Sequence, residues 1–539
     1  MRDWAPRVLV IGWDGADWRL LQPLMAQGRL PNLVTLLVRA AHGVLLSTVP
    51  PVTGPAWSSF ITGCWPARHG LLSWQLPLNE RLERPWVNAS ALHGPSLWQL
   101  LSAAGQRLGV LNVPLTYPPP ALNGELVAGM LTPSIAAQFT YPPNLRAALL
   151  AELPGYKLDV DLQHTERDTQ ATIGVRRFLR EVETALDHRE RAVDFLWRRG
   201  PFDFFMVVFE TPDRLQHPLY QFASGQAAEH RPDGEAVREA VVHLYARCDA
   251  ILGSILACVD DQTTVILLSD HGFSPLRAVW HLNDWLAQEG YLTWASGISQ
   301  RRSLLVRRAL TPVKYWLPQR WLQHGREVFA PLKLVDWSGT QAYSGLPTEE
   351  GIWLNVRGRE PLGIVEPGAS YERLREELIA ALQAFTDPQT GRPIVRRACR
   401  REEIHDGPFI GQAPDIVLVL EEGYKVTPGR AQAGLVDDVF TQGRGIHRRE
   451  GIVAIAGPGV PSGSLGTAML PDLLPTILVA AGLDVPPGLD GRPLVGSAVE
   501  PIAYSVNKSE ARLPETAAAY SEEEAALIAA RLRDLGYLE

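Results

Sequence analysis

Cysteine is scarce in this sequence of 539 residues, which contains only four of them. Cys64, Cys248, Cys258 and Cys399 lie far apart, and no two of them form a Cys-x-x-Cys pair. Disulfide frameworks and cysteine-ligated zinc sites both need clustered or regularly spaced cysteines. The sequence therefore argues against both kinds of architecture.

Long apolar runs and a surplus of positive charge are missing as well. No stretch of eighteen or more apolar residues occurs, so we expect no membrane-spanning helix. Residues 1–6 lead directly into a short apolar run, without the longer apolar core and cleavage site of a signal peptide. The formal net charge is −8, whereas proteins that bind nucleic acid usually present a basic face. These absences predict a cytoplasmic protein that does not bind nucleic acid.

Hydrophobic residues make up 46% of the chain, which is ample for a large core. Short runs rich in β-branched and aromatic residues predict buried strands, and near-continuous apolar runs fit a parallel sheet covered on both faces. Strands that alternate with amphipathic helices predict an α/β fold with a doubly wound, mostly parallel sheet. The predicted strands span residues 7–12, 202–209, 263–268, 415–420 and 451–456, and the predicted helices span 18–25, 32–41, 97–104, 234–259, 371–385 and 472–481.

Acidic and histidine side chains lie at the ends of four predicted strands. Ligands of open α/β sheets bind outside the carboxyl ends of the strands, so we expect these side chains to converge. Asp and His are ligands that Zn²⁺ and, less selectively, Mn²⁺ accept. Two ions about 3.5–4 Å apart suit in-line displacement at phosphorus, because they hold the attacking and leaving oxygens. The six candidate ligands are Asp14, Asp213, His217, Asp270, His271 and His447.

Each of these six residues also has a simpler interpretation. An Asp after a strand is commonly a turn or capping residue. A single His is more often structural than metal-binding, and short motifs have a high false-positive rate. Their joint position at strand ends favours the metal-site hypothesis over six independent structural roles.

Thr53 begins the segment that could supply a nucleophile. It follows two prolines and precedes Gly54-Pro55 and a short apolar helix. A hydroxyl at a helix start lies near free N–H groups that favour negative charge, so Thr53 could both attack phosphorus and have its phosphoryl group cradled. Thr is equally a common N-cap before a helix with Pro near its first position. The local sequence leaves both interpretations open.

Taken together, these motifs resemble those of the alkaline phosphatase superfamily. The resemblance is greatest to its type I phosphodiesterase/nucleotide pyrophosphatase branch and to bacterial proteins described as predicted phosphohydrolases or phosphomutases. It runs from residue 7 to about residue 495, with the motifs in family order. The motifs are Asp14-Gly15, Thr53-Gly54-Pro55, Thr62-Gly63 through His69-Gly70, Thr211-Pro212-Asp213 with His217, Ser269-Asp270-His271-Gly272, Gly445-Ile446-His447 and residues 470–494.

The resemblance implies a ligand set and a reaction. It places the Thr53 oxygen between metal and phosphorus, and it implies a covalent phospho-threonine intermediate that water then opens. Zinc is the expected metal for both sites, with manganese as the alternative. The resemblance assigns Asp213, His217 and His447 to one ion, and Asp14, Asp270 and His271 to the other.

Two features of the sequence around Thr53 bear on the substrate class. Cys64 to Arg68 has the Cys-x-Pro-x-Arg pattern that sulfatases convert to formylglycine, but sulfatases carry it ten residues before the Gly of a Thr-Gly pair. Here Thr53 stands ten residues before Gly63, which argues for phosphate esters over sulfate esters. Nucleotide pyrophosphatases typically have Asn three residues after the nucleophile, where this chain has Ala56. The residue that holds a phosphate oxygen is therefore not identified by the resemblance.

Arg68 and Arg214 lie near the motifs and are candidates for holding the phosphate. Most Arg residues are exposed, so we expect surface or structural positions for both. The segment 301–333 carries eight Lys and Arg residues against one acid. We favour a solvated surface for this segment over a weak contact with a membrane surface. Trp337 and Tyr343 are candidates for lining a substrate pocket.

We expect the chain to divide into a core and an insertion. Residues 1–275 and 441–500 are predicted to form the core, and residues 276–440 a cap region that includes part of the core sheet. Residues 501–539 are predicted to form a helical tail, in which Ser521 to Leu535 has the pattern of a capped amphipathic helix.

Three functions are compatible with the sequence. The favoured one is hydrolysis of a phosphodiester or phosphomonoester through Thr53. A phosphomutase would use the same residue but return the phosphoryl group to its own product. A phospholipid-headgroup transferase at a membrane surface is the third. The expected partner is a small phosphorylated substrate, and the sequence leaves the ester, the metal and the oligomeric state open.

Overall fold

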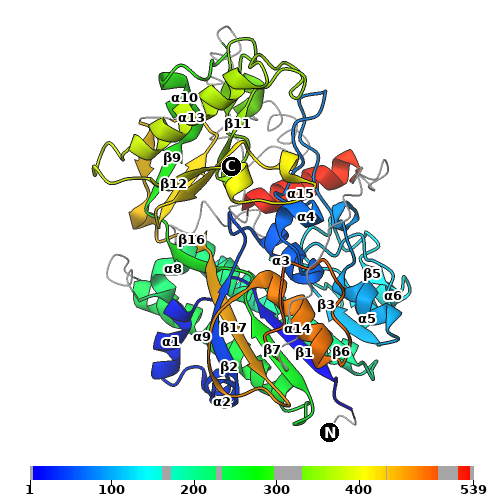
Figure 1. Cartoon of the computed structure of the whole chain (residues 1–539). Helices are drawn as coiled ribbons and strands as arrows, with labels where there is room; N and C mark the ends of the chain where they lie inside the picture. The colour runs from blue at the N-terminus through cyan, green and yellow to red at the C-terminus, as the bar shows by residue number, and fades with distance from the viewer. Residues whose placement is uncertain are drawn as a thin grey trace.

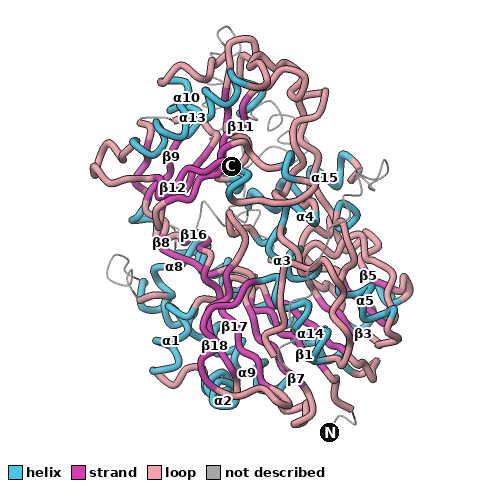
Figure 2. Tube along the Cα trace, viewed as in Figure 1, coloured by secondary structure: helices cyan, strands magenta, loops and turns pink. Residues whose placement is uncertain are grey.

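The computed structural model describes residues 4–160, 172–225, 233–295, 331–431, 434–495 and 520–534. Its main feature is a nine-stranded sheet in the lower body of the molecule (Figures 1 and 2). The central strand β1 is parallel to both its neighbours, whereas β17 is antiparallel to both of its own. In spatial order the strands are β18 (Gly463–Met469), β2 (Ala41–Leu46), β17 (Glu450–Ala456), β7 (Thr264–Leu268), β1 (Val8–Trp13), β6 (Phe204–Phe209), β3 (Leu108–Leu111), β4 (Gly124–Val127) and β5 (Thr140–Tyr141).

The central strands are apolar and fully buried. β1, β6 and β7 have no exposed residue along their lengths. A strand that is covered on both faces has no solvent side, so its sequence is continuously apolar instead of alternating. Helices pack against the sheet in one large hydrophobic core, which confirms the doubly wound, mostly parallel α/β fold. These helices are α1 (Trp18–Ala26), α2 (Pro31–Arg39), α3 (Thr53–Thr62), α5 (Leu97–Ala103), α6 (Leu145–Glu152), α7 (Thr172–Trp197), α8 (Thr211–Ala223), α9 (Gly234–Leu256) and α14 (Leu473–Ala480). The short helix α4 (Pro66–His69) follows α3.

A smaller body lies above the main sheet in Figure 1 and has its own hydrophobic core. It contains a four-stranded antiparallel sheet and a three-stranded sheet. We call this body the cap. Its elements are β9 (Ala278–His281), α10 (Leu282–Gln288), β10 (Ala342–Tyr343), β11 (Gly351–Leu354), α13 (Ala369–Ala384), β12 (Val395–Arg400), β13 (Ile416–Leu420), β14 (Tyr424–Thr427) and β15 (Val436–Asp438).

The strand predicted at residues 415–420 belongs to the cap. It is observed as β13, but it pairs antiparallel with β11 and β12 instead of joining the main sheet. None of the nine main strands comes from the described residues between 276 and 440, so the expected part of the core sheet is not found there. A short apolar run shows that a strand is buried, but it does not show which sheet buries it.

A two-stranded ribbon connects the main sheet to the cap. β8 (Gly272–Pro275) follows β7 and pairs antiparallel with β16 (Gly445–Arg448), which precedes β17. This ribbon brings residues near 272 and 447 together, although they are far apart in the chain. It is one side of the site described below.

The C-terminal helix α15 (Glu522–Asp534) packs against the body, as the sequence predicts. Ser521 Oγ accepts from Glu524 N at 3.2 Å while Glu524 Oε2 accepts from Ser521 N at 2.9 Å, which forms a capping box. Ile528 and Leu532 on its inner face are fully buried.

All four cysteines are free. In the part of the chain that the structure describes, no helix is long and apolar enough to cross a membrane. The basic segment 301–333 lies outside the described residues except for residues 331–333. The solvated surface favoured for it and the weak membrane contact therefore both stay predictions.

Candidate metal centre

The six candidate ligands meet at the carboxyl-terminal ends of the central strands of the main sheet. Asp14 follows β1, and Asp270-His271 follow β7. Asp213 and His217 lie one helical turn apart on α8, which follows β6. His447 lies on β16 opposite Phe273 of β8. The carboxyl ends of three parallel strands and the β8–β16 ribbon therefore converge, as expected for an open α/β sheet.

Three of the six side chains form a first group around Asp213. Its Oδ1 lies 3.4 Å from His217 Nε2 and 3.3 Å from His447 Nε2. The two ring nitrogens are 3.1 Å apart. His447 is fixed from behind, because its Nδ1 lies 2.9 Å from the carbonyl of Pro51. All three side chains thus direct one ligand atom to a common point.

The other three side chains form a second group around His271. Its Nε2 lies 3.3 Å from Asp270 Oδ2 and 3.8 Å from Asp14 Oδ1. These two carboxylate oxygens are buried and, among the described residues, have no hydrogen-bond partner. A buried carboxylate oxygen without a partner is costly. A divalent cation would supply the missing partner, so the donor set fits a metal ion.

The two groups touch each other. The rings of His271 and His447 are stacked with centroids 3.6 Å apart, and His271 Nε2 lies 4.0 Å from Asp213 Oδ1. Two compact sets of ligand atoms among the described residues include His271, so this residue links the two groups. The sets are Asp213, His271 and His447, and Asp14, Asp270 and His271.

Thr53 lies beside the second group. It is the first residue of α3, and the N-cap of this helix is Val52, with no side-chain cap. Thr53 Oγ1 lies 3.1 Å from His271 Nε2, the same nitrogen that faces the two unpaired carboxylate oxygens. The threonine hydroxyl is therefore positioned at the metal centre, and capping does not account for its place in the sequence.

Burial and mutual charge set the protonation of the carboxylates. Burial, and then the charges of neighbouring carboxylates, raise the pKa of Asp14 and of Asp270 well above the ordinary value. Burial alone would raise the pKa of Asp213 as well, but the charges of His217 and Arg214 hold it well below the ordinary value. Two of the three acids therefore resist ionisation until a cation neutralises them.

Burial has the opposite effect on the histidines. It lowers the pKa of His217 to about 4 and lowers that of His271 well below the ordinary value. A neutral imidazole is the form that binds a metal ion. At neutral pH these two rings are therefore ready to act as ligands.

The sequence matches one protein family along most of its length. The profile described as type I phosphodiesterase / nucleotide pyrophosphatase covers residues 8–448. The chain belongs to this family. It is therefore a phosphoric ester hydrolase of a family whose members typically depend on divalent metals.

Solved structures show the same fold. Phosphonoacetate hydrolase from Sinorhizobium meliloti 1021 is similar with a TM-score of 0.53 and 18% sequence identity, over 88% of this chain and 96% of that one. Alkaline phosphatase PafA is similar with a TM-score of 0.51 and 13% identity, over 91% and 98% of the two chains. No curated protein matches the sequence closely enough to serve as a relative.

Within this phosphodiesterase-family chain, two further side chains hold the candidate ligands in place. Trp57 Nε1 donates to Asp14 Oδ2 at 3.0 Å, and Arg214 pairs with Asp213 Oδ2. Arg214 is itself fixed by Asp159, with 2.9 Å from both Nε and Nη2 to the carboxylate. The sequence did not indicate Trp57 or Asp159, because neither lies at a strand end or within a ligand motif.

The two arginines near the motifs are structural, as expected. Arg214 is buried between Asp159 and Asp213. Arg68 pairs with Asp490 and donates to the carbonyl of Gly488. Both guanidinium groups already have protein partners, so neither is placed to take up a phosphate group.

Three other residues from the sequence analysis lie away from the centre. Cys64 follows the C-terminal end of α3, at the opposite end from Thr53, and burial raises its thiol pKa to about 11. A protonated thiol is a poor nucleophile. Trp337 and Tyr343 pack edge to face in the cap core, with ring centroids 4.9 Å apart. Their burial there does not support a pocket-lining position.

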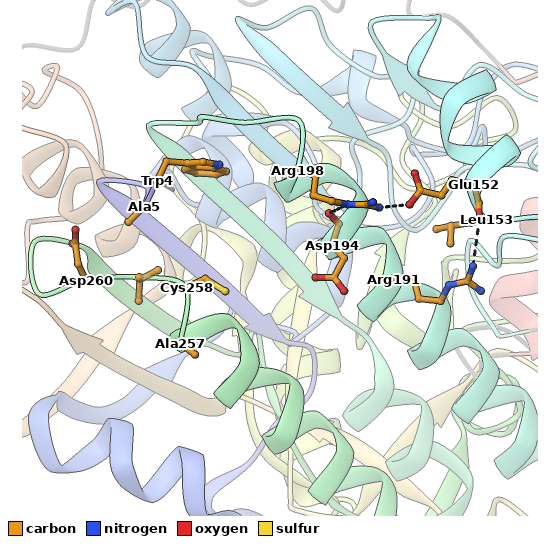
Figure 3. A pocket seen from close by; sticks show the side chains of 11 residues that line it. Trp4, Ala5, Glu152, Leu153, Arg191, Asp194, Arg198, Ala257, Cys258 and Asp260 are labelled. Carbon is orange, nitrogen blue, oxygen red and sulfur yellow. Dashed lines mark hydrogen bonds and ion pairs between the residues drawn. The ribbon is translucent and has the colours of Figure 1, made fainter. Parts of the chain in front are cut away.

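A large cavity of about 1030 Å³ lies at the opposite, amino-terminal ends of the central strands. Its lining includes Trp4 and Ala5 before β1, Arg198 before β6, and residues 257–260 before β7 (Figure 3). These are the amino-terminal ends of the parallel strands, whereas the candidate ligands follow the carboxyl ends. Arg198 is paired with Glu152 inside this cavity. The cavity is therefore separate from the metal centre.

Proposed function

We propose that this chain is a two-metal phosphohydrolase that cleaves a phosphate ester through a phospho-threonine intermediate at Thr53. The observation that carries the proposal is the position of the Thr53 hydroxyl. It shares His271 Nε2 with the two buried, unpaired carboxylate oxygens of Asp14 and Asp270. A nucleophile and a set of metal ligands thus meet at one atom.

The ligand chemistry favours zinc. Three imidazoles and three carboxylates match the nitrogen and oxygen donors that Zn²⁺ accepts, with Mn²⁺ as the alternative. Asp213, His217 and His447 would hold one ion, and Asp14, Asp270 and His271 the other, with the Thr53 oxygen as a further ligand. Bound ions would make the hydroxyl of Thr53 acidic enough to react near neutral pH and would offset charge on the phosphoryl group.

The reaction has two displacements. In the first, the Thr53 oxygen bonds to phosphorus and loses its proton, while the bond from phosphorus to the ester oxygen breaks and the departing alkoxide takes up a proton. In the second, a water oxygen bonds to phosphorus and the bond to Thr53 breaks, which returns the hydroxyl. A monoester releases inorganic phosphate, and a diester releases a monoester. The start of α3 adds N–H groups that favour this anionic chemistry.

A rate comparison on two small esters tests this proposal. We expect purified protein loaded with Zn²⁺ or Mn²⁺ to hydrolyse p-nitrophenyl phosphate, bis-p-nitrophenyl phosphate or both, and to lose this activity on chelation. The ratio of the two rates assigns the monoester or diester subclass. Release of an isomer without phosphate or alcohol would point to a phosphomutase instead. No turnover of either ester with two ions bound would contradict the proposal.

A further inference from the structure

Arg449 lies at the same sheet edge as the metal centre. It stands between β16 and β17, and its carbonyl accepts from Ser47 N at 2.8 Å. The next residue, Glu450, pairs in register with Leu46 at the end of β2. Because β2 and β7 are both antiparallel to β17, they run in the same direction and end at the same edge. Arg449 therefore lies where β2 ends, beside the strand that leads into Asp270.

The side chain of Arg449 turns toward the loop that leads into Thr53. Its Nε and Nη2 donate to the carbonyl of Ser47 at 3.3 and 3.2 Å. The candidate ligand His447, two residues earlier, faces the same loop, with Nδ1 2.9 Å from Pro51 O. The side chain between them turns away and pairs with Asp17 at 3.2 Å. His447 and Arg449 thus lie against residues 47–53 together.

Arg449 forms no ion pair among the described residues, although the neighbouring Glu450, which pairs with Arg448, acts on its charge. Arg448, its neighbour, pairs with Asp17 and Glu450. Arg449 is half-buried, but among the described residues it forms no ion pair and its Nη1 has no hydrogen-bond partner. A partly desolvated cation that meets only a carbonyl is costly unless an anion completes its environment. An anion from solution would complete that environment.

We propose that Arg449 binds the non-bridging oxygens of the substrate's phosphate group, an inference that rests on the proposed function. A planar guanidinium presents parallel N–H donors that match phosphate geometry. The chain also needs such a donor, because Ala56 stands where nucleotide pyrophosphatases have a phosphate-binding Asn. Arg68 and Arg214 are held by acidic partners. Arg449, in contrast, forms no ion pair among the described residues, which leaves its guanidinium available for an anion.

The test measures phosphate binding directly in the metal-loaded enzyme. Arg449→Met removes the charge with little change in volume. Arg449→Lys keeps the charge but lacks the planar guanidinium with its parallel N–H donors. Arg396→Met, on the exposed face of the cap, is the matched control. We expect the inhibition constant of inorganic phosphate to rise at least ten-fold in Arg449→Met, to rise less in Arg449→Lys, and to stay unchanged in Arg396→Met. Added guanidinium should partly restore phosphate inhibition in Arg449→Met.

Metal content and wild-type turnover separate the outcomes. An inhibition constant within two-fold of wild type in Arg449→Met, with two ions bound, would overturn the assignment while leaving the phosphohydrolase proposal intact. Lost metal with unchanged phosphate affinity of the loaded fraction would also overturn it, because Arg449 would then be structural. Absence of turnover in the wild type would instead count against the proposed function.

Discussion

At the scale of single residues, the three carboxylates of the centre differ in what balances their charge. Asp213 has Arg214 on one oxygen and two histidines near the other, which together hold its pKa low. For Asp14 and Asp270, burial followed by the charges of neighbouring carboxylates outweighs the lowering contributions and raises the pKa. The second group is therefore the one whose charge most depends on a bound ion.

This contrast predicts that metal uptake releases protons. A raised pKa keeps part of the Asp14 and Asp270 population protonated above the ordinary carboxyl range, and a cation displaces those protons. His217 and His271 are already neutral at these pH values and contribute none. Titration calorimetry in two buffers of different ionisation enthalpy should show proton release that shrinks as the pH rises through the raised carboxyl pKa.

The Asp14→Asn variant is the control for this titration. It removes one titrating group without a large change in shape, so fewer protons should be released per ion bound. Equal proton release at every pH, or none at mildly acidic pH, would show that Asp14 and Asp270 are ionised in the metal-free enzyme.

The candidate ligands could be found from the sequence because the chemistry lies at strand ends. Each is adjacent to an apolar run, so its place at the sheet edge follows from the fold class. Trp57 and Arg449 could not be found in this way. Trp57 contacts Asp14 through tertiary packing from the second turn of α3, and Arg449 contacts Ser47, in the loop before Thr53, from a strand junction. No local pattern encodes a hydrogen bond between residues 43 positions apart.

At the scale of elements, the start of α3 decides how Thr53 is used. The sequence allowed Thr53 to be a cap, but Val52 occupies the N-cap with extended backbone and Thr53 is already helical. A threonine inside the first turn is not needed to cap the helix. Its hydroxyl is turned toward His271 instead.

The C-terminal helix α15 packs against segments that contact Arg214, close to the candidate metal centre. Tyr520 just before it stacks on Tyr117 and donates to the carbonyl of Leu131 at 2.9 Å. Met130, next to Leu131, has its sulfur 3.9 Å from Arg214 Nη2. The tail therefore packs behind the arginine that holds Asp213.

Removing apolar packing from α15 should destabilise the core body. Leu532 is fully buried, so Leu532→Ala should lower the free energy of unfolding by about 3 kcal/mol through lost burial and a cavity. Leu527 on the same helix is 38% exposed, and Leu527→Ala should cost about 0.5 kcal/mol or less. Urea unfolding of both variants measures the difference. Equal losses would mean that α15 does not dock as described.

At the scale of the whole molecule, four of the nine main strands were predicted, and all four are almost fully buried. The short strands β3, β4 and β5 were not predicted, although β3 is fully buried. β1, β6 and β7 correspond to the predicted runs, because continuous apolar sequence is sufficient evidence for a central strand. β2, partly exposed along much of its length, and β18, mostly exposed, were not predicted. β17 was predicted, but its antiparallel pairing was not, since partner and direction depend on contacts between distant segments.

A buried ion pair joins the core to the cap. Arg84, on a loop of the core, forms a two-pronged pair with Glu349 of the cap, and both side chains are almost fully buried. Glu349 also accepts from Trp353 Nε1 at 3.1 Å. Removing one member of a buried pair leaves the other charge uncompensated.

Glu349→Gln should therefore lower the free energy of unfolding by about 3–5 kcal/mol. The control is Glu421→Gln, which breaks the exposed Arg396–Glu421 pair on the cap surface and should cost about 1 kcal/mol or less. Chemical unfolding of both variants at low and high salt makes the comparison. A loss in Glu349→Gln no greater than that of the control would remove Arg84–Glu349 as a link between the two bodies.

The central claim is that Thr53 attacks phosphorus at a two-metal centre. The most direct measurement compares Thr53→Ala with wild type for turnover of p-nitrophenyl esters and for metal content per chain. The account predicts that Thr53→Ala keeps its fold and its two ions but loses turnover by about three orders of magnitude or more, as expected when a nucleophile is removed. Turnover within a few-fold of wild type, with two ions bound, would contradict it.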